Sequence, residues 1–283
     1  MRQPNMLRAK GFGIEIQVAD WPGEGRPVLA VHGLTANSRC WDVMASALSP
    51  KHRFLAVDLR GRGLSDKPKT GYSIDYHCRD LEAVLKDLGL AKAAVLGHSL
   101  GAYIALALAA TRPEIVDRLI LMDGGAQLPV EQWLKIAAGI KPSLDRLEMT
   151  FPSFDDYLAS VKGSPFFQPW TKDMEDFFRY ESEEVGGVFR SRTRPENILE
   201  ERTSLAQTDT ARYYKDVRCP VLILRATQGM VTGDDHVLPQ AAANELLKTL
   251  PGARLVNVQG TNHYSILLQP NEQRNRAILD FLA

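Results

Sequence analysis

The sequence Gly97-His98-Ser99-Leu100-Gly101 constrains the fold of this chain more than any other five residues. It has the pattern G-x-S-x-G, preceded by the apolar run 93–96 and followed by the Ala/Leu-rich stretch 102–110. This arrangement is typical of a strand that passes through a sharp turn directly into a helix. The two glycines leave room at the turn that side chains would fill. The sequence therefore predicts a strand–turn–helix unit with the Ser99 hydroxyl exposed at the turn.

Apolar runs and helical patterns alternate on both sides of this unit. The predicted strands are 13–19, 28–31, 54–57, 93–96, 119–122, 221–224 and 253–258, and the predicted helices are 41–48, 75–88, 102–110, 240–250 and 270–282. Short, continuously apolar runs are typical of strands buried on both faces. Their alternation with helices indicates an α/β fold with a mostly parallel sheet between two helical layers.

The alternation stops between Gln127 and Asp216, where we expect helices broken by prolines and no strand. Seven of the ten phenylalanines of the chain lie in this segment. Because the strand and helix pattern resumes afterwards, the segment is interpreted as an insertion into one sheet. We therefore expect a core formed by residues 1–126 and 217–283, and a helical lid formed by residues 127–216.

Composition excludes several classes of partner. The chain has 34 basic and 34 acidic residues and no basic stripe, which argues against nucleic acid. Its longest apolar runs are shorter than the roughly 20 residues of a membrane span, and residues 1–10 lack the apolar region of a secretory signal. Cys40, Cys78 and Cys219 are too scattered for a disulfide framework or a zinc site. We therefore expect a cytoplasmic protein without a metal or cofactor.

Four motifs together point to one family: His32-Gly33, the run 58–65 with the pattern D-x-R-G-x-G-x-S, the turn around Ser99, and Asn262-His263. With them the chain resembles the α/β-hydrolase superfamily, in its lidded branch of serine esterases, lactonases and C–C hydrolases. The resemblance covers the whole chain except the lid. It implies a mostly parallel eight-stranded sheet flanked by helices, with a helical lid inserted after the sixth strand.

The resemblance also implies a catalytic triad. Serine is a weak nucleophile and needs an adjacent base, which is itself oriented by an acid. In this superfamily the three residues follow the chain order serine, acid, histidine. The turn then becomes a nucleophile elbow that carries Ser99, and the base is expected on the loop after the last strand, where His263 stands.

The acid has three candidates. In the family it commonly lies in the loop after the strand 221–224, near a G-x-x-D-x-x-x-P pattern. Asp235, four residues before Pro239, fits this pattern better than Asp234 and is the favoured candidate. Asp123 is the alternative, because some members carry the acid at the end of the preceding strand. The loop 227–235 is longer than the pattern requires, which leaves this assignment open.

The oxyanion hole needs two backbone N–H donors. The residue after the nucleophile supplies one of them, which predicts Leu100. The loop after the strand 28–31 supplies the other, and there Gly33 allows a close approach of the backbone. Leu34 is the expected second donor.

Ser99 argues against the epoxide hydrolases and haloalkane dehalogenases of this superfamily, which use aspartate at the elbow. We expect a serine hydrolase that cleaves carboxylic esters or related acyl bonds through an acyl-enzyme. Alternatives are a lactonase or C–C bond hydrolase with the same triad, a cofactor-free perhydrolase or oxygenase, and a non-catalytic ligand receptor. The aromatic lid predicts a small apolar or aromatic acyl substrate. A monomer and a homodimer both remain open.

Overall fold

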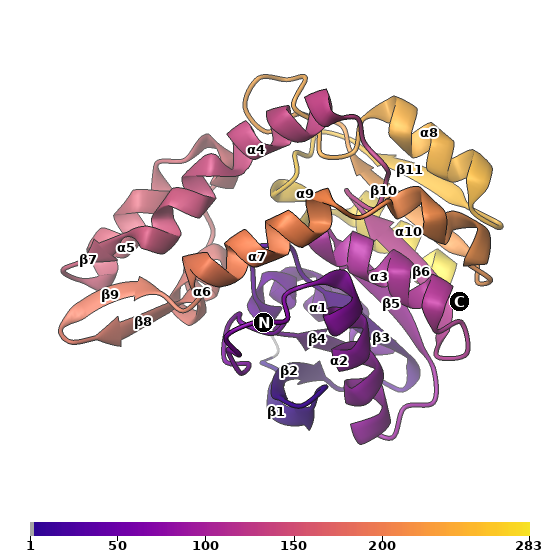
Figure 1. The fold of residues 1–283 in the computed structure, drawn as a ribbon, viewed down its shortest axis with the longest axis horizontal. Helices are drawn as coiled ribbons and strands as arrows, with labels where there is room; N and C mark the ends of the chain where they lie inside the picture. The colour runs from indigo at the N-terminus through magenta and orange to yellow at the C-terminus, as the bar shows by residue number, and fades with distance from the viewer. Residues whose placement is uncertain (1–2) are drawn as a thin grey trace.

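A computed structural model describes residues 3–283 and contains a central eight-stranded sheet (Figure 1). The strands are β1 (Asn5–Lys10), β2 (Glu15–Trp21), β3 (Gly25–Val31), β4 (His52–Val57), β5 (Ala93–His98), β6 (Val116–Met122), β10 (Val221–Ala226) and β11 (Arg254–Val258). They lie in the order β1-β2-β4-β3-β5-β6-β10-β11. The α/β fold class and the mostly parallel sheet predicted from the sequence are confirmed.

The sheet is parallel except at one edge. β2 pairs antiparallel with both β1 and β4, whereas every pair from β4 to β11 is parallel. The central strands β3, β5 and β6 are apolar and buried over residues 28–31, 93–96 and 119–122, because helices cover both of their faces there. β1 was not predicted. It is a mostly exposed edge strand that contains Arg8 and Lys10, and it therefore lacks the apolar run of a buried strand.

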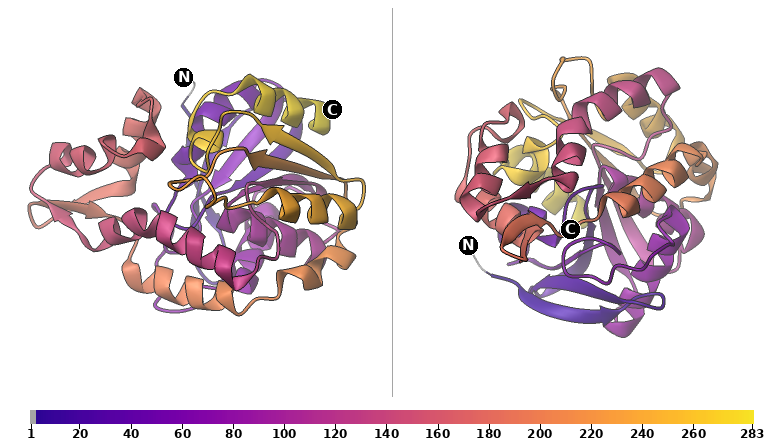
Figure 2. Two further views of the ribbon diagram at one scale, coloured as in Figure 1. Left: turned by 90° about the horizontal axis from the view of Figure 1, so that it is seen from above. Right: turned by 60° about the vertical axis from the view of Figure 1, so that its left-hand side comes forward.

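Helices cover the sheet in two groups (Figure 2). They are α1 (Asp42–Leu48), α2 (Ile74–Asp87), α3 (Leu100–Thr111), α8 (Gln240–Thr249), α9 (Ser265–Leu268) and α10 (Glu272–Leu282). α1 contacts α9 and α10, while α2 contacts α3. Nearly every residue of α3 is buried, which explains why its sequence is apolar on all sides and not only on one face.

Between β6 and β10, residues 127–216 (the inserted segment) extend away from the sheet (Figure 1). Its elements are α4 (Val130–Asp145), η2 (Arg146–Glu148), β7 (Thr150–Phe151), α5 (Phe154–Lys162), η3 (Pro165–Phe167), α6 (Lys172–Glu181), β8 (Ser182–Val185), β9 (Val188–Ser191), α7 (Pro195–Ala206) and η4 (Thr210–Asp216). α4 leads outward from the core and α7 leads back.

The prediction that the inserted segment contains no strand is wrong. β7, β9 and β8 form a small antiparallel sheet. The turn between β8 and β9 is Gly186-Gly187, with φ of 60° and 82°. A two-residue hairpin turn needs positive φ at both central positions, so the Gly-Gly pair was the sequence signal that identifies this hairpin.

Buried polar contacts hold the inserted segment against the core. The Glu201 carboxylate of α7 accepts hydrogen bonds from Arg62 Nη2 and His77 Nε2, each at 2.8 Å. The Tyr180 hydroxyl of α6 donates to Asp58 at 2.7 Å. Burial by itself raises the pKa of Glu201, but His77 and Arg62 lower it to about 2. Glu201 is therefore an anion that is paired with the Arg62 guanidinium and hydrogen-bonded to His77, which fixes α7 in place.

Candidate active site

Ser99 occupies a strained turn between β5 and α3. Its backbone has φ 56° and ψ −121°, a conformation that non-glycine residues rarely adopt. A Cβ at Gly97 would lie 2.0 Å from the Gly101 carbonyl oxygen, and one at Gly101 would lie 2.0 Å from the Val31 carbonyl oxygen. Only glycine fits at these two positions, because Gly97 lies against the start of α3 and Gly101 lies against the end of β3. This is the sharp strand-to-helix turn that the G-x-S-x-G sequence predicts.

Asp123 lies directly beside His263. His263 Nδ1 is 2.8 Å from Asp123 Oδ2, and both side chains are buried. The second carboxylate oxygen, Oδ1, accepts the Ala226 N–H at 3.1 Å. Asp123 follows the last residue of β6 and has φ 48°, while His263 lies in the loop between β11 and α9. The ends of β6 and β11 thus bring the carboxylate and the imidazole together at the edge of the sheet where Ser99 lies.

Asp235, the favoured acid of the sequence analysis, is located elsewhere. Its Oδ2 accepts the Val231 N–H within the same loop at 2.7 Å, and Oδ1 has no hydrogen-bond partner among residues 3–283. Asp234 is exposed and binds Lys135 of α4 at 2.8 Å. The long loop after β10 folds back on itself and against α4, so its two carboxylates serve local contacts. The hydrogen bond predicted from His263 to Asp235 goes to Asp123 instead.

His98 supports the ring of His263, a contact that the sequence analysis did not identify. The two rings are stacked with centroids 4.5 Å apart, and His98 Nε2 donates to the His263 carbonyl oxygen at 2.9 Å. Burial, together with the neighbouring His263, lowers the pKa of His98 well below its usual range. His98 is therefore neutral and adds no like charge beside His263. The sequence feature that could have indicated this contact is the position of His98 directly before Ser99 in the G-x-S-x-G motif.

Leu34 and Leu100, the predicted oxyanion donors, both line the cavity that contains Ser99. Leu100 is the first residue of α3, so its N–H lacks a partner within the helix. The peptide group that carries the Leu34 N–H has the Gly33 carbonyl at its other end, and His32 Nδ1 donates to that carbonyl at 2.7 Å. Because the carbonyl and N–H of a trans peptide point in opposite directions, this bond fixes the direction of the Leu34 N–H.

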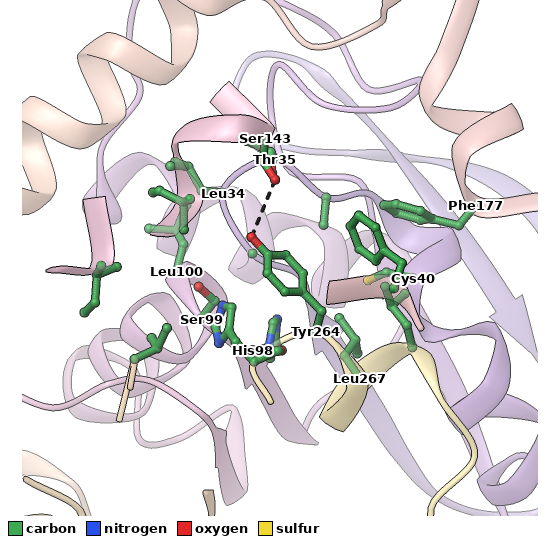
Figure 3. Close-up of a pocket in the computed structure, with 18 of the residues that line it drawn as sticks. Leu34, Thr35, Cys40, His98, Ser99, Leu100, Ser143, Phe177, Tyr264 and Leu267 are labelled. Atoms are coloured by element: carbon green, nitrogen blue, oxygen red, sulfur yellow. Dashed lines mark hydrogen bonds between the residues drawn. The ribbon is translucent and has the colours of Figure 1, made fainter. Parts of the chain in front are cut away.

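A cavity of about 110 Å³ lies over Ser99 (Figure 3), and His263 is one of the residues that line it. Its apolar walls come from both the core and the inserted segment and include Leu100, Leu267, Trp133, Ile136, Phe167 and Phe177. The polar side chains in the wall are few. Away from Ser99, they include Ser143, Arg146 and Tyr264, and Figure 3 shows the Tyr264 hydroxyl directed at Ser143, at 3.5 Å. The cavity suits a compact, largely apolar ligand with a small polar part.

Neither a cluster of metal-binding side chains nor a membrane-spanning helix is present among residues 3–283. This part of the chain has no group of three or more His, Cys, Asp or Glu side chains placed to hold a metal ion. It also has no helix long and apolar enough to cross a membrane.

The chain is similar in sequence and in structure to known hydrolases. The family model for the alpha/beta hydrolase fold matches residues 26–270. The 2-(acetamidomethylene)succinate hydrolase of Mesorhizobium japonicum is 29% identical over 92% of this chain and 89% of that protein. A serine hydrolase-like protein of Danio rerio is 27% identical over 92% of this chain and 82% of its own length. The crystal structure of E-2-(acetamidomethylene)succinate hydrolase has a TM-score of 0.85 and 26% identity, and it covers 99% of both chains.

Proposed function

This chain belongs to the α/β-hydrolase fold family, and from that premise we propose that it hydrolyses a carboxylic ester or related acyl bond of a small molecule. Ser99 is the nucleophile, His263 the base, and Asp123 the acid that orients His263. The observation that carries the proposal is the 2.8 Å hydrogen bond between His263 and Asp123, next to a serine held on a strained turn.

The reaction begins with proton transfer. His263 Nε2 removes the Ser99 proton while Nδ1–H donates to Asp123, which fixes the tautomer of the ring and stabilises the imidazolium that forms. Because His98 is neutral, no second positive charge lies against that imidazolium. The Ala226 N–H holds the other oxygen of Asp123, so the carboxylate cannot rotate away from His263.

Ser99 Oγ then attacks the substrate carbonyl, and the N–H groups of Leu34 and Leu100 stabilise the oxyanion. His263 returns the proton to the leaving group as the carbon–heteroatom bond breaks and the acyl-enzyme forms. Water activated by His263 releases the acid and regenerates Ser99. The same groups act in both halves of the reaction, and in each half His263 first takes up a proton and then returns it.

The inserted segment acts as a lid over this site. It provides Trp133, Ile136, Phe167 and Phe177 to the cavity wall, and these side chains exclude water around the reacting carbonyl. A dry environment strengthens the hydrogen bonds to the oxyanion. A small apolar or aromatic acyl group fits these walls better than a long polar one.

Three variants test the assignment of the triad with p-nitrophenyl acetate and butyrate as substrates. Ser99→Ala should lower kcat by several orders of magnitude and abolish labelling by a fluorophosphonate probe. Asp123→Asn should lower kcat by about 10⁴, because it leaves the base in the wrong tautomer. Asp235→Asn is the matched control and should stay within about tenfold of the unmodified protein, since the hydrogen bond of the Asp235 carboxylate is to Val231 of its own loop and not to His263.

The controls separate catalysis from folding. Thermal unfolding of each variant establishes that the protein is folded before its activity is measured. Full labelling and turnover of Ser99→Ala would refute the proposed nucleophile. A large loss in Asp235→Asn with little loss in Asp123→Asn would show that the acid had been assigned to the wrong loop.

A further inference from the structure

One end of the otherwise apolar cavity carries a group of hydrogen-bond donors. Ser143 and Arg146 lie one helical turn apart, at the junction of α4 and η2, and therefore on the same side. Tyr264, the residue after His263, extends its hydroxyl to within 3.5 Å of the Ser143 hydroxyl (Figure 3). All three side chains line the cavity that contains Ser99. They form what we call the donor cluster: Ser143, Arg146 and Tyr264.

The guanidinium group of Arg146 is only partly used. It pairs with Glu181 through Nη2 alone, at 3.0 and 3.3 Å, and its face lies 5.3 Å from the centre of the Phe178 ring. The Nε atom is buried and has no hydrogen-bond partner among the described residues. Arg146 is 7% exposed, and an unpaired donor at that burial is costly unless a ligand satisfies it.

Glu181 does not depend on Arg146 alone for its hydrogen bonds. The Tyr157 hydroxyl donates to it at 2.6 Å and the Ser191 hydroxyl at 3.2 Å. Arg146 stays charged, because Glu181 and Tyr157 outweigh the tendency of burial to lower its pKa. A guanidinium group has five N–H donors in a planar fork, so it can bind a second carboxylate on the edge that Glu181 leaves open.

We propose that the donor cluster binds a carboxylate group of the substrate while Ser99 attacks an acyl carbon at the other end of the same molecule. The inference rests on the proposed function and narrows it: the preferred substrate is a compact acyl compound with a free carboxylate remote from the bond that is cleaved. Arginine matches the planar geometry of a carboxylate, and the apolar walls strengthen the attraction. Ser143 and Tyr264 supply hydroxyl donors to the same anion.

Matched substrate pairs test this directly. The monomethyl esters of succinate, glutarate and adipate carry a free carboxylate, and the corresponding dimethyl esters are their neutral counterparts. In the unmodified protein we expect kcat/KM to be higher for the better monoester than for its diester. The ratio of the two values, monoester over diester, should therefore exceed unity. Arg146→Met should lower this ratio by about 10- to 100-fold, the range for loss of a hydrogen bond to a charged group.

Two further variants control for structure. Arg146→Lys keeps a positive charge and should recover part of the ratio. Arg179→Met removes an exposed arginine that stacks on Phe154 in the same inserted segment, and it should leave the ratio unchanged. A purely structural role for Arg146 would lower activity on both esters equally and leave the ratio unmoved, which would overturn the proposal.

A binding measurement separates this inference from the proposed chemistry. Calorimetric titration of the Ser99→Ala variant with monomethyl glutarate and monomethyl adipate needs no turnover. Binding that weakens by about 10- to 100-fold when Arg146→Met is added supports the carboxylate site even if neither ester is hydrolysed. Equal binding with and without Arg146 would overturn the site even if Ser99 proves to be the nucleophile.

Discussion

Acidification should destabilise this protein through His32, a buried histidine beside the proposed oxyanion hole. His32 Nε2 accepts the Leu59 N–H at 3.0 Å, and Nδ1 donates to the Gly33 carbonyl at 2.7 Å. Only the neutral ring with its proton on Nδ1 can make both bonds, because a protonated ring has no acceptor. Complete burial is the largest factor that lowers the pKa of His32, to about 3 from a usual value of 6.5.

The sign and size of the effect follow from this shift. The unfolded chain binds a proton at His32 near pH 6.5, whereas the folded chain does so only near pH 3. Between these values the unfolded state holds more protons, so the free energy of unfolding falls as the pH falls. Each pH unit within the window costs about 1.4 kcal/mol, which amounts to about 3 kcal/mol at pH 4.5 and about 5 kcal/mol at pH 3 and below.

Urea denaturation at a series of pH values from 7 to 4 measures this contribution. His32→Asn cannot titrate, so the slope of its unfolding free energy against pH should be smaller by about 1.4 kcal/mol per unit between pH 6 and 4. His236→Asn serves as the control, because it removes a histidine of the loop after β10 and leaves both hydrogen bonds of His32 in place. If the His32 variant and the unmodified protein lose stability in parallel, His32 is not the group that resists protonation.

Two further substitutions test the turn and the attachment of the inserted segment. Gly97→Ala forces a methyl group onto a backbone carbonyl oxygen 2.0 Å away, so it should lower the free energy of unfolding in urea by more than about 4 kcal/mol or prevent folding. Gly163→Ala is its control and should lower that free energy by less than about 1 kcal/mol, because the added methyl group meets nothing within 4 Å. Glu201→Gln leaves Arg62 buried without its anion and should lower the free energy of unfolding by about 3–5 kcal/mol. Glu196→Gln, on the exposed side of the same helix, is its control and should change that free energy by less than about 0.5 kcal/mol. Equal costs for a variant and its control, in either the glycine pair or the glutamate pair, would contradict the structure.

The sequence predicted the parts of the fold that are dictated by burial. Residues 28–31 of β3, 93–96 of β5 and 119–122 of β6 are continuously apolar because both faces of these strands are covered, and that pattern is visible without coordinates. β1 and the β8–β9 hairpin are exposed and short, so backbone pairing and turn geometry decide their structure more than hydrophobicity does. Such strands leave only a weak trace in the pattern of apolar residues.

The candidate site was predictable where chemistry and local geometry coincide. Ser99 is identified by the glycines that its turn requires, and His263 by its place after the last strand. The position of the carboxylate was not predictable, because β6 and β10 end side by side at the same edge of the sheet. Either following loop can deliver an aspartate to His263, and the choice depends on how the longer loop packs against α4.

The proposed role of Arg146 could not be predicted from the sequence. That role depends on which of the Arg146 donors Glu181 occupies and on the cavity that reaches this residue, and both arise only in the folded chain. In the sequence it is one arginine among many charged residues. Only the three-dimensional arrangement distinguishes it from a surface residue such as Arg179.

The Gly186-Gly187 turn has a consequence for how this molecule can be modified. It stands at the tip of the hairpin, both glycines are exposed, and a Cβ at either one would meet nothing within 4 Å. Exposed loop tips of this kind tolerate additional residues. A peptide tag or fluorophore grafted at this tip would therefore leave the walls of the cavity unchanged.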